Sequence, residues 1–221
     1  AVASSLERVA PQTDVAIELG GEDAKIIYFR GGLEQRMNGV CAGGTGSFID
    51  QMASLLQTDA QGLNQAAADY QEIYPIAARC GVFAKSDIQP LINEGATLPD
   101  LSASIFQAVV NQTISGLACG KPIRGHVAFL GGPLHFLSEL REAFIRTLKL
   151  DDEHIIAPTH SHLFAAIGSA LNSKRDLSVS LQELQERLAG HIHMDFEVER
   201  LTPLFSSRAD YDEFQSRHAK H

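Results

Sequence analysis

The sequence is poor in cysteine and in positive charge, and it has no long apolar run. Because a membrane-spanning helix needs about 20 consecutive apolar residues, we expect no membrane span. The three cysteines, an odd and widely spaced set, do not match the disulfide framework of a small secreted protein, so a cytoplasmic location is expected. With 27 acidic residues, 18 basic residues and a net charge of −9, neither nucleic acid nor an anionic membrane is the expected partner.

Two familiar motifs are also missing. No Gly-Lys-Ser or Gly-Lys-Thr follows a glycine pair, which excludes a Walker phosphate loop. Cys41 and Cys80 belong to no Cys-x-x-Cys pair. Cys119 stands at the end of a predicted helix, before Gly120, and is expected to serve packing.

The pattern along the chain predicts an α/β domain with a mixed sheet over residues 13–172. Apolar segments at 15–19 and 25–29, followed after a glycine turn by a third strand at 33–37, predict a three-stranded antiparallel meander. Short strands are expected at 126–130 and 155–157. Helical periodicity begins near residue 45 and is expected at 45–56, 59–70, 82–94, 99–119, 134–148 and 163–171. The alternation of strands and helices indicates an α/β sheet.

The two ends of the chain have a different character. Residues 1–12 are short and polar. Residues 173–221 are expected to form a tail or linker that leads out of the domain, with one surface helix at 178–188. Periodicity is weak beyond residue 191, so the tail is expected to be helical or irregular there.

The first candidate site is the segment 18–25, which reads Glu-Leu-Gly-Gly-Glu-Asp-Ala-Lys. A carboxylate at a strand end followed by two glycines can hold phosphate oxygens and a magnesium ion. Glycine allows backbone N–H groups to approach the phosphates, and the carboxylate positions a metal-bound water. An ordinary hairpin turn is the alternative.

The second candidate site is Gly131-Gly132-Pro133, which follows a buried strand and precedes a helix. A strand–glycine–helix junction can bind a nucleotide at the N-terminus of the helix. A tight connection without a ligand is the alternative.

Two cysteines are candidate metal ligands. Cys41 and Cys80 each precede a predicted helix start, and Cys41 is followed by Gly43-Gly44-Thr45-Gly46. A helix N-terminus carries partial positive charge and favours a thiolate. Two thiolates supply half of a four-thiolate shell around a soft metal or cluster, so a second copy would supply the rest. Buried structural cysteines are the alternative.

A pair of histidines, His160 and His162, could also bind a metal. Their spacing on a loop is a weak signal, and a solvated helix start is the preferred interpretation.

Four motifs, in the same order, resemble those of the ATP-dependent activators of 2-hydroxyacyl-CoA dehydratases, which are related to the ATPase subunits of benzoyl-CoA reductase. Residues 18–25 are similar to the family's second phosphate motif, Asp-Ile-Gly-Gly-Gln-Asp-x-Lys. Residues 37–48 and 80–86 are similar to the motifs around its two cluster cysteines, and residues 131–132 to its adenosine-side glycine pair. The resemblance covers about residues 13–172. It implies the second lobe of an actin-like, ribonuclease H-like ATPase fold, with a mixed sheet and an antiparallel meander flanked by helices.

The resemblance also implies a site and its partners. Cys41 and Cys80 would hold a [4Fe-4S] cluster shared between two copies of the lobe, in a homodimer or a tandem repeat. ATP with Mg²⁺ would drive electron transfer to a dehydratase or reductase partner. Glu18 and Glu22 would take the catalytic positions. The nucleotide-binding residues would be Gly20, Gly21, Lys25, Gly44, Thr45, Gly46, Gly131 and Gly132.

The chain departs from the family pattern in three respects. Glu18 stands where the family has Asp, and Glu22 where it has Gln, so weaker binding of the metal nucleotide is expected. The family's first phosphate loop, Asp-x-Gly-Ser-Thr, has no counterpart here, so the chain is expected to be a fragment with little ATPase activity alone. Two alternatives stay open: an actin-like sugar or acyl kinase lobe without a cluster, and a degenerate regulatory or scaffold lobe.

Overall fold

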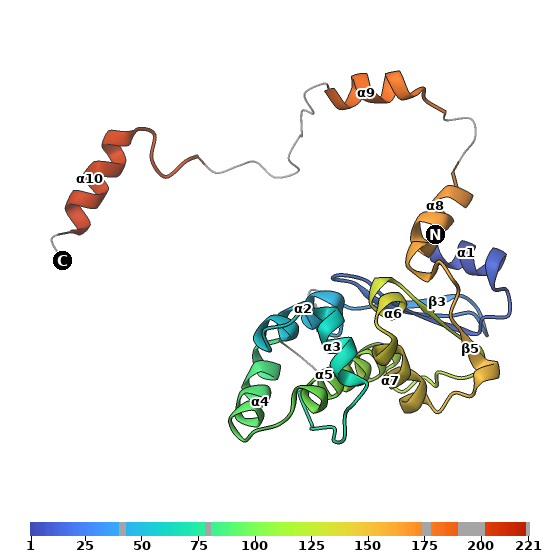
Figure 1. Ribbon diagram of the computed structural model, residues 1–221. Coiled ribbons are helices and arrows are strands. Elements are labelled where there is room, and N and C mark those ends of the chain that lie inside the picture. Colours follow the sequence, from blue (N-terminus) through green and yellow to red (C-terminus); the bar gives the residue numbers. More distant parts are fainter. Residues whose placement is uncertain (40–42, 78–80, 174–177, 190–201, 220–221) are drawn as a thin grey trace. The chain divides into compact units, whose positions relative to one another are not determined.

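The computed structural model describes residues 1–39, 43–77, 81–173, 178–189 and 202–219. The chain divides into two compact units, Ala1–Ser173 and Lys174–His221 (Figure 1). Among the described residues, none of the helices has the length and apolar character needed to cross a bilayer.

The first unit is built on a five-stranded mixed sheet with the order β3-β2-β1-β4-β5. The strands are β1 (Val15–Leu19), β2 (Ala24–Tyr28), β3 (Glu34–Met37), β4 (Val127–Leu130) and β5 (Ile155–Ile156). β1, β2 and β3 pair antiparallel, which confirms the predicted meander. β4 joins β1 in parallel, with Val15 opposite Val127, and β5 extends the parallel part.

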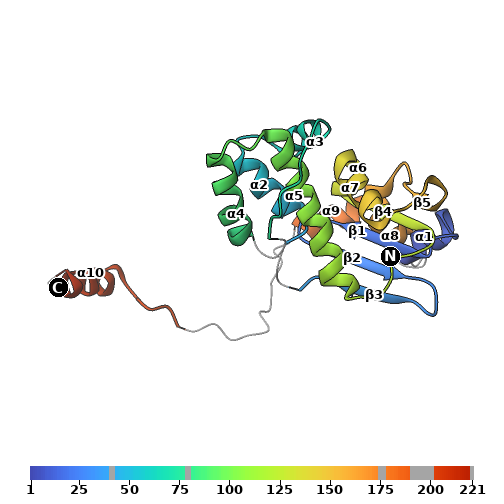
Figure 2. The same cartoon turned by 90° about the horizontal axis from the view of Figure 1, so that it is seen from below.

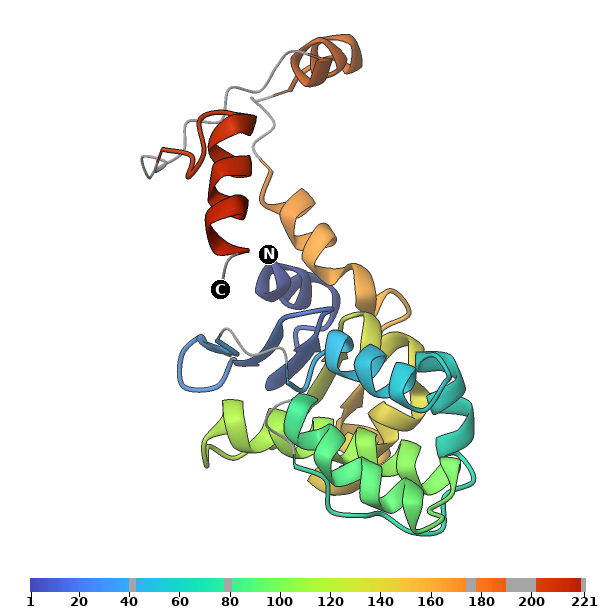
Figure 3. The same cartoon turned by 90° about the vertical axis from the view of Figure 1, so that its left-hand side faces the viewer.

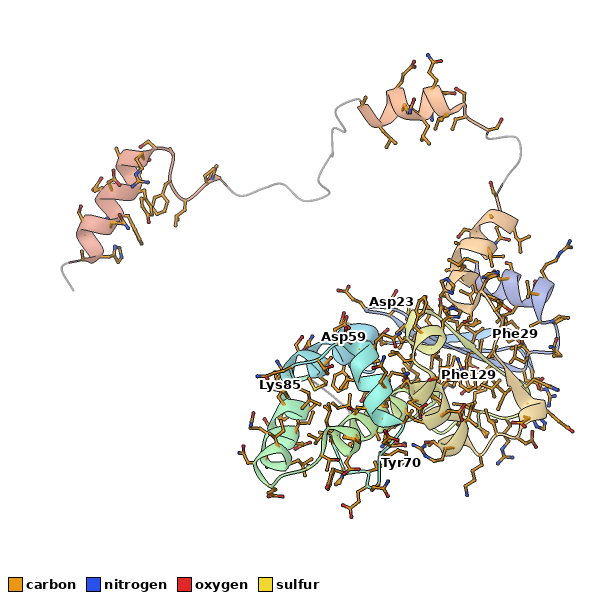
Figure 4. All side chains as sticks on the ribbon, viewed as in Figure 1. Asp23, Phe29, Asp59, Tyr70, Lys85 and Phe129 are labelled. Carbon is orange, nitrogen blue, oxygen red and sulfur yellow. The ribbon has the colours of Figure 1, made fainter. Side chains whose placement is uncertain are left out.

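Helices cover both faces of this sheet (Figures 1 and 2). They are α1 (Val2–Val9), α2 (Gly46–Leu55), α3 (Ala60–Ala67), α4 (Gly81–Asn93), α5 (Leu98–Thr113), α6 (Gly132–Phe136), α7 (Ser138–Leu148) and α8 (Phe164–Leu171), with the π-helical turn η1 (Ile114–Ala118) and the 3₁₀ turns η2 (Asp152–His154) and η3 (Ser161–Leu163). Successive strand residues point to opposite faces. Ile17 therefore belongs to the large cluster formed with α2–α7, whereas Ala16 belongs to the cluster formed with α1 and α8. Phe129 lies inside the unit, while Asp23 and Lys85 lie at its surface (Figure 4).

Residues 1–12, expected as a short polar segment, contain the helix α1. Val2 and Leu6, four residues apart, are buried beneath the sheet face that α8 also covers. The hydroxyl of Ser5 donates to the carbonyl oxygen of Phe164 at 2.5 Å. A Cβ atom on Gly168 would overlap the carbonyl oxygen of Ala1, so the small residue permits the close approach of α1 and α8 (Figure 3).

Two predicted helices are interrupted in the structure. The helix expected at 134–148 is split at Leu137, whose backbone is extended, into α6 and α7. The side-chain oxygen of Asn64 on α3 accepts from the N–H of Glu139 at 2.9 Å and so caps the start of α7. The helix expected at 99–119 becomes η1 after Thr113, and the Arg36 guanidinium donates to the carbonyl oxygen of Leu117 at 3.2 Å near its end.

The second unit contains α9 (Leu181–Ala189) and α10 (Arg208–His218). α9 agrees with the predicted surface helix, and α10 lies in the part of the tail that was expected to be helical or irregular. Ser207 and Asp210 form a capping box at the start of α10, in which each side chain accepts from the other residue's backbone N–H. This local cap compensates for the weak apolar periodicity of the helix.

Candidate functional site

Three glycine-rich segments meet at one edge of the sheet. β1 and β4 run parallel with Glu18 opposite Leu130, so both strands end at the same edge. Gly131 follows β4 with φ +90°, and a Cβ atom there would overlap the carbonyl oxygen of Leu19. Only glycine permits this close passage of the two strand ends. The fold therefore brings together the two candidate segments, residues 18–25 and 131–133.

The turn after β1 is held by hydrogen bonds from two sides. Its own closing bond runs from the N–H of Gly20 to the carbonyl oxygen of Asp23, at 2.7 Å. On one side, the N–H groups of Gly46 and Ser47 donate to the carbonyl oxygens of Gly20 and Gly21 at 2.9 and 2.7 Å. These two donors belong to the first turn of α2, so the N-terminal end of that helix lies against the turn.

Asn38 holds the same turn from the other side. Its Oδ1 accepts from the N–H of Ala24 at 2.8 Å, and its Nδ2 donates to the carbonyl oxygen of Glu22 at 2.9 Å. Asn38 is not among the predicted site residues, although it lies in the segment 37–48 that resembles the family's motif around a cluster cysteine. That motif, and the position of an asparagine directly after a strand, are the signals that could have found it.

A cleft of about 450 Å³ opens where these segments meet. Gly21 and Gly46 border one part of it, and the start of α6 borders another. The lining residues are Gly21, Gly46, Ile49, Asp50, Ala60, Gln61, Gly132, Pro133, Phe136 and Leu137. A Cβ atom on Gly46 would lie 3.2 Å from the carbonyl oxygen of Gly20 and 3.4 Å from Cγ of Pro133, so Gly46 fits tightly between the two predicted segments.

The predicted catalytic carboxylates lie apart. Glu18, near the end of β1, forms a cross-strand ion pair with Lys25 at 3.3 Å, with side chains only 12% and 23% exposed. Glu18 shares the strand face of Ala16, which α1 and α8 cover, rather than the face of Ile17. Glu22 is exposed in the turn. The two predicted residues Glu18 and Lys25 are therefore brought together, and Glu22 is not part of their pair.

The remaining predicted binding residues lie at the start of α2. Gly44 has φ +80° and is buried against α5, where a Cβ atom would lie 3.0 Å from Cγ of Gln112. Thr45 is the N-cap residue of α2 and is fully buried. Both residues lead the chain toward the contact between Gly46 and the turn.

The two predicted cluster ligands, Cys41 and Cys80, lie outside the described residues. Their described neighbours are close in space: a Cβ atom on Gly81, the first residue of α4, would lie 2.8 Å from Oε1 of Gln51 on α2. α2 and α4 follow the two cysteines in the sequence, so the helices after both cysteines are neighbours. Within the described ranges, no group of three or more His, Cys, Asp or Glu side chains could hold a metal ion.

Cys119 was expected to be buried in packing, and this prediction is wrong. Its thiol is exposed at the end of η1, where the residue has φ +46°, and Sγ lies 3.2 Å from the carbonyl oxygen of Gly116. The left-handed backbone turns the chain away from the core directly after the π-helical turn.

A group of aromatic rings beside the cleft was also missed. His135 on α6 forms a cluster of three rings with Phe136 and His162, whose ring centroids lie 4.6 and 4.1 Å from that of His135. Nδ1 of His135 is 2.8 Å from the hydroxyl of Ser161. Burial, reinforced by the positive charge that His162 and Arg141 bring, lowers the pKa of His135.

His162 was interpreted as solvated, but it is only partly exposed. Its Nδ1 is buried without a hydrogen-bond partner in the part of the chain that the structure describes.

Comparisons with known proteins agree with this architecture. The sequence profile of the BadF/BadG/BcrA/BcrD ATPase family matches residues 6–173. The 2-hydroxyisocaproyl-CoA dehydratase activator of Clostridioides difficile is 29% identical over 180 residues, which are 80% of this chain and 66% of the relative. The (R)-2-hydroxyglutaryl-CoA dehydratase activating ATPase of Acidaminococcus fermentans is 33% identical over 124 residues, which are 55% of this chain and 47% of the relative.

Two solved structures have the same fold. Component A of the (R)-2-hydroxyglutaryl-CoA dehydratase of Acidaminococcus fermentans superposes with a TM-score of 0.70 at 29% identity, over 78% of this chain and 65% of the other. The activator of the 2-hydroxyisocaproyl-CoA dehydratase from Clostridium difficile, solved with bound ADPNP, gives 0.69 at 27% identity, over 91% and 69%. The chain spans about half to two thirds of the length of the curated relatives it matches. The mixed sheet flanked by helices is thus that of the activators, with an actin-like ATPase fold, as predicted.

Proposed function

The chain belongs to the BadF/BadG/BcrA/BcrD ATPase family, and we propose that it forms one lobe of an ATP-dependent activator that passes electrons to a 2-hydroxyacyl-CoA dehydratase or a related reductase. The observation that carries the proposal is the meeting of residues 18–25, 44–46 and 131–133 around one cleft at the carboxyl edge of parallel strands. Ligands of α/β sheets bind at this edge. The names of two relatives, a dehydratase activator and a dehydratase activating ATPase, support a dehydratase as the partner.

In this proposal the cleft holds the nucleotide of MgATP. The first turn of α2 brings partial positive charge to the Gly20-Gly21 turn, which suits phosphate oxygens. Gly131 and Gly132 allow the adenosine part to approach the backbone between β4 and α6. The ion pair of Glu18 with Lys25 lies at the end of β1, outside the lining of this cleft. Glu18 would be the magnesium ligand by its place in the family's phosphate motif, and Lys25 would hold its carboxylate. The solved neighbour with bound ADPNP supports nucleotide binding by this fold.

The proposed cluster ligands are Cys41 and Cys80, with the same two residues of a second copy. Thiolates are the donors that iron–sulfur clusters require, so the chemistry of the two residues fits the group. The contact of Gly81 with α2 supports the proposal, because it joins the helices that follow both cysteines. When bound, a [4Fe-4S] cluster supplies reversible one-electron chemistry, and nearby helix N-termini favour its reduced, more negative state.

Electron transfer to a dehydratase tests the proposal. The full-length protein, reconstituted anaerobically and chemically reduced, is mixed with a 2-hydroxyacyl-CoA dehydratase of the kind its relatives activate. We expect dehydration activity only with MgATP, and none with MgADPNP. Activation that needs no nucleotide would contradict the proposal. Transfer of phosphate to a sugar or acyl substrate would also contradict it, if the rate of transfer were the same in Cys41→Ser and Cys80→Ser as in the wild type. That result would support the kinase lobe instead.

A further inference from the structure

Phe136 is an aromatic residue that the fold leaves at the surface of the cleft. It is the last residue of α6 and lines the cleft of about 450 Å³, and 57% of it is exposed. The nearby Leu134 and Leu137 are only 1% and 4% exposed, so this part of the chain buries two leucines and leaves the larger ring outside. Single exposed apolar residues are common, so the surroundings of Phe136 decide whether the ring has a role.

Two imidazole rings hold the Phe136 ring in place. His135 meets it edge to face, with ring planes at 86°, and the centroid of the His162 ring lies 5.2 Å away. The bond between His135 and the Ser161 hydroxyl fixes the first of these imidazoles. From α3, Nε2 of Gln61 donates to the carbonyl oxygen of Phe136 at 3.5 Å. A ring that is fixed in advance loses little conformational entropy when a ligand binds to it.

The cleft changes in character along α6. Gly21 and Gly46 present backbone to it, and the proposed function assigns the phosphates to this part. From Gly132 to Phe136 the helix rises by about 6 Å, at 1.5 Å per residue. Within the described residues, the cleft is lined by only two polar side chains, Asp50 and Gln61. The other lining side chains are apolar: Ile49, Ala60, Pro133, Phe136 and Leu137.

We propose that Phe136 is the residue on which the base of the bound nucleotide stacks. The inference rests on the proposed function, because it takes the phosphates at the Gly20-Gly21 turn as its starting point. A nucleotide has a sugar ring between its phosphates and its base, so the base lies farther along α6, at the level of Phe136. The face of a base is a π-surface, and its stacking on an aromatic side chain requires no hydrogen bond.

Two ligands that differ in the base separate this role from phosphate binding. The full-length protein is titrated by calorimetry with MgADPNP and with magnesium tripolyphosphate, which has no base. The wild type should bind MgADPNP at least about tenfold more tightly, because base–aromatic stacking typically contributes about this factor. Equal affinities of the wild type for the two ligands would overturn the inference.

Two variants of Phe136 test the ring itself. Phe136→Leu keeps an apolar side chain without the ring, and should weaken MgADPNP binding about tenfold while its affinity for tripolyphosphate stays that of the wild type. Phe136→Tyr keeps the ring and should bind both ligands like the wild type. Because more than half of Phe136 is exposed, both variants are expected to fold, and the Tm of each checks this.

Phe29→Leu is the matched control for loss of a phenyl ring. Phe29 follows β2, where its N–H donates to the carbonyl oxygen of Asp14 at 2.9 Å, and it does not line the cleft (Figure 4). The affinities of this variant for MgADPNP and for tripolyphosphate should both equal those of the wild type.

The outcomes separate this inference from the proposed function. If the wild type binds neither ligand, the nucleotide site itself fails, and the stacking role with it. If MgADPNP binds but Phe136→Leu keeps the wild-type affinity, the stacking role is wrong while the nucleotide site stands. Equal losses for both ligands in Phe136→Leu, or the same loss of MgADPNP affinity in Phe136→Tyr or Phe29→Leu, would also overturn the role, because contact of the ring with the base would not be the cause.

Discussion

The two edges of the same sheet are built by different means. At the carboxyl edge of β1 and β4, backbone N–H and carbonyl groups of glycine segments make the contacts, and a cleft remains open. At the opposite edge, the Asp14 side chain closes the structure. Its Oδ2 accepts from the N–H of His126 at 2.7 Å, its Oδ1 pairs with Arg30, and only 9% of the side chain is exposed.

This difference shows which edge is built for a ligand. The Asp14 carboxylate is satisfied within the chain: burial alone would raise its pKa, but the bonds from His126 and Arg30 hold the pKa below its ordinary value. The carboxyl edge instead has glycines at positions where a side chain would block the approach of a ligand or of a neighbouring segment to the backbone. A change of Asp14 at the closed edge should therefore affect stability alone. At the open edge, a change of Gly131 should affect stability, and a change of Glu18 should affect nucleotide binding.

The largest expected effect is that of Gly131→Ala. A Cβ atom there would overlap the carbonyl oxygen of Leu19, at a φ of +90°, so the two strand ends could not pass. We expect a loss of at least about 4 kcal/mol in the free energy of unfolding, measured by urea denaturation. Gly132→Ala is the matched control, because nothing lies within 4 Å of its Cβ position. Equal stability of the two variants would contradict the close approach.

The second largest effect is expected for Asp14→Asn, at the closed edge. Asp14→Asn should lower the free energy of unfolding by about 2 kcal/mol at pH 7, because a buried charged acceptor loses its pairing with Arg30. Since the pKa of Asp14 is lowered on folding, its contribution is present above the ordinary value of 3.8 and is lost as the pH falls through the folded pKa. The variant should therefore lose less stability on acidification, while its nucleotide affinity, followed by calorimetry, stays that of the wild type.

A third change sharpens the contrast at the open edge. Glu18→Gln should weaken binding of MgATP by the full-length protein about tenfold, or about 1.4 kcal/mol, and should also lower the Tm, because it breaks the largely buried ion pair with Lys25. The expected loss depends on magnesium, so affinity without the metal should differ little from that of the wild type. Glu34→Gln on β3, which breaks the ion pair of Glu34 with Lys121, is the control and should leave affinity unchanged. An equal loss in both variants would speak against a metal role for Glu18.

The smallest effect concerns His135. Its pKa is lowered in the folded protein, so the stability tied to its neutral form is fully present above the ordinary value of 6.5. That stability is lost as the pH falls below 6.5 and through the folded pKa. Denaturation of the wild type and His135→Gln between pH 7.5 and 5.5 should show a steeper decline for the wild type. Parallel declines would show that the ring is solvated.

Local signals account for the parts of the fold that were predicted correctly. Short strand segments and glycine turns lie within a few residues of one another, so the meander of β1–β3 follows from local sequence alone. The same holds for the junction at Gly131, where a strand, two glycines and a proline stand together. For the segments 18–25 and 131–133, spacing alone did not decide between a binding site and an ordinary turn, and the resemblance to the family motifs favoured the binding site.

The features that were not predicted depend on contacts between residues far apart in the sequence. The break at Leu137 depends on Asn64, a residue of a different helix, which caps α7. The π-helical turn depends on Arg36 of β3, and α1 depends on Gly168 of α8. Asn38 was missed for the same reason, because its two bonds matter only once the turn is in place. Such contacts join residues far apart in the sequence, where no periodic pattern records them.

Iron analysis after anaerobic reconstitution tests the central claim most directly. If Cys41 and Cys80 each supply one thiolate to a cluster shared by two copies, the full-length protein should hold about two irons and two sulfides per copy of the lobe. Cys41→Ser and Cys80→Ser should each abolish this, and Cys119→Ser should not. A colourless wild-type protein, or an iron content unchanged in the Cys41 and Cys80 variants, would contradict the account.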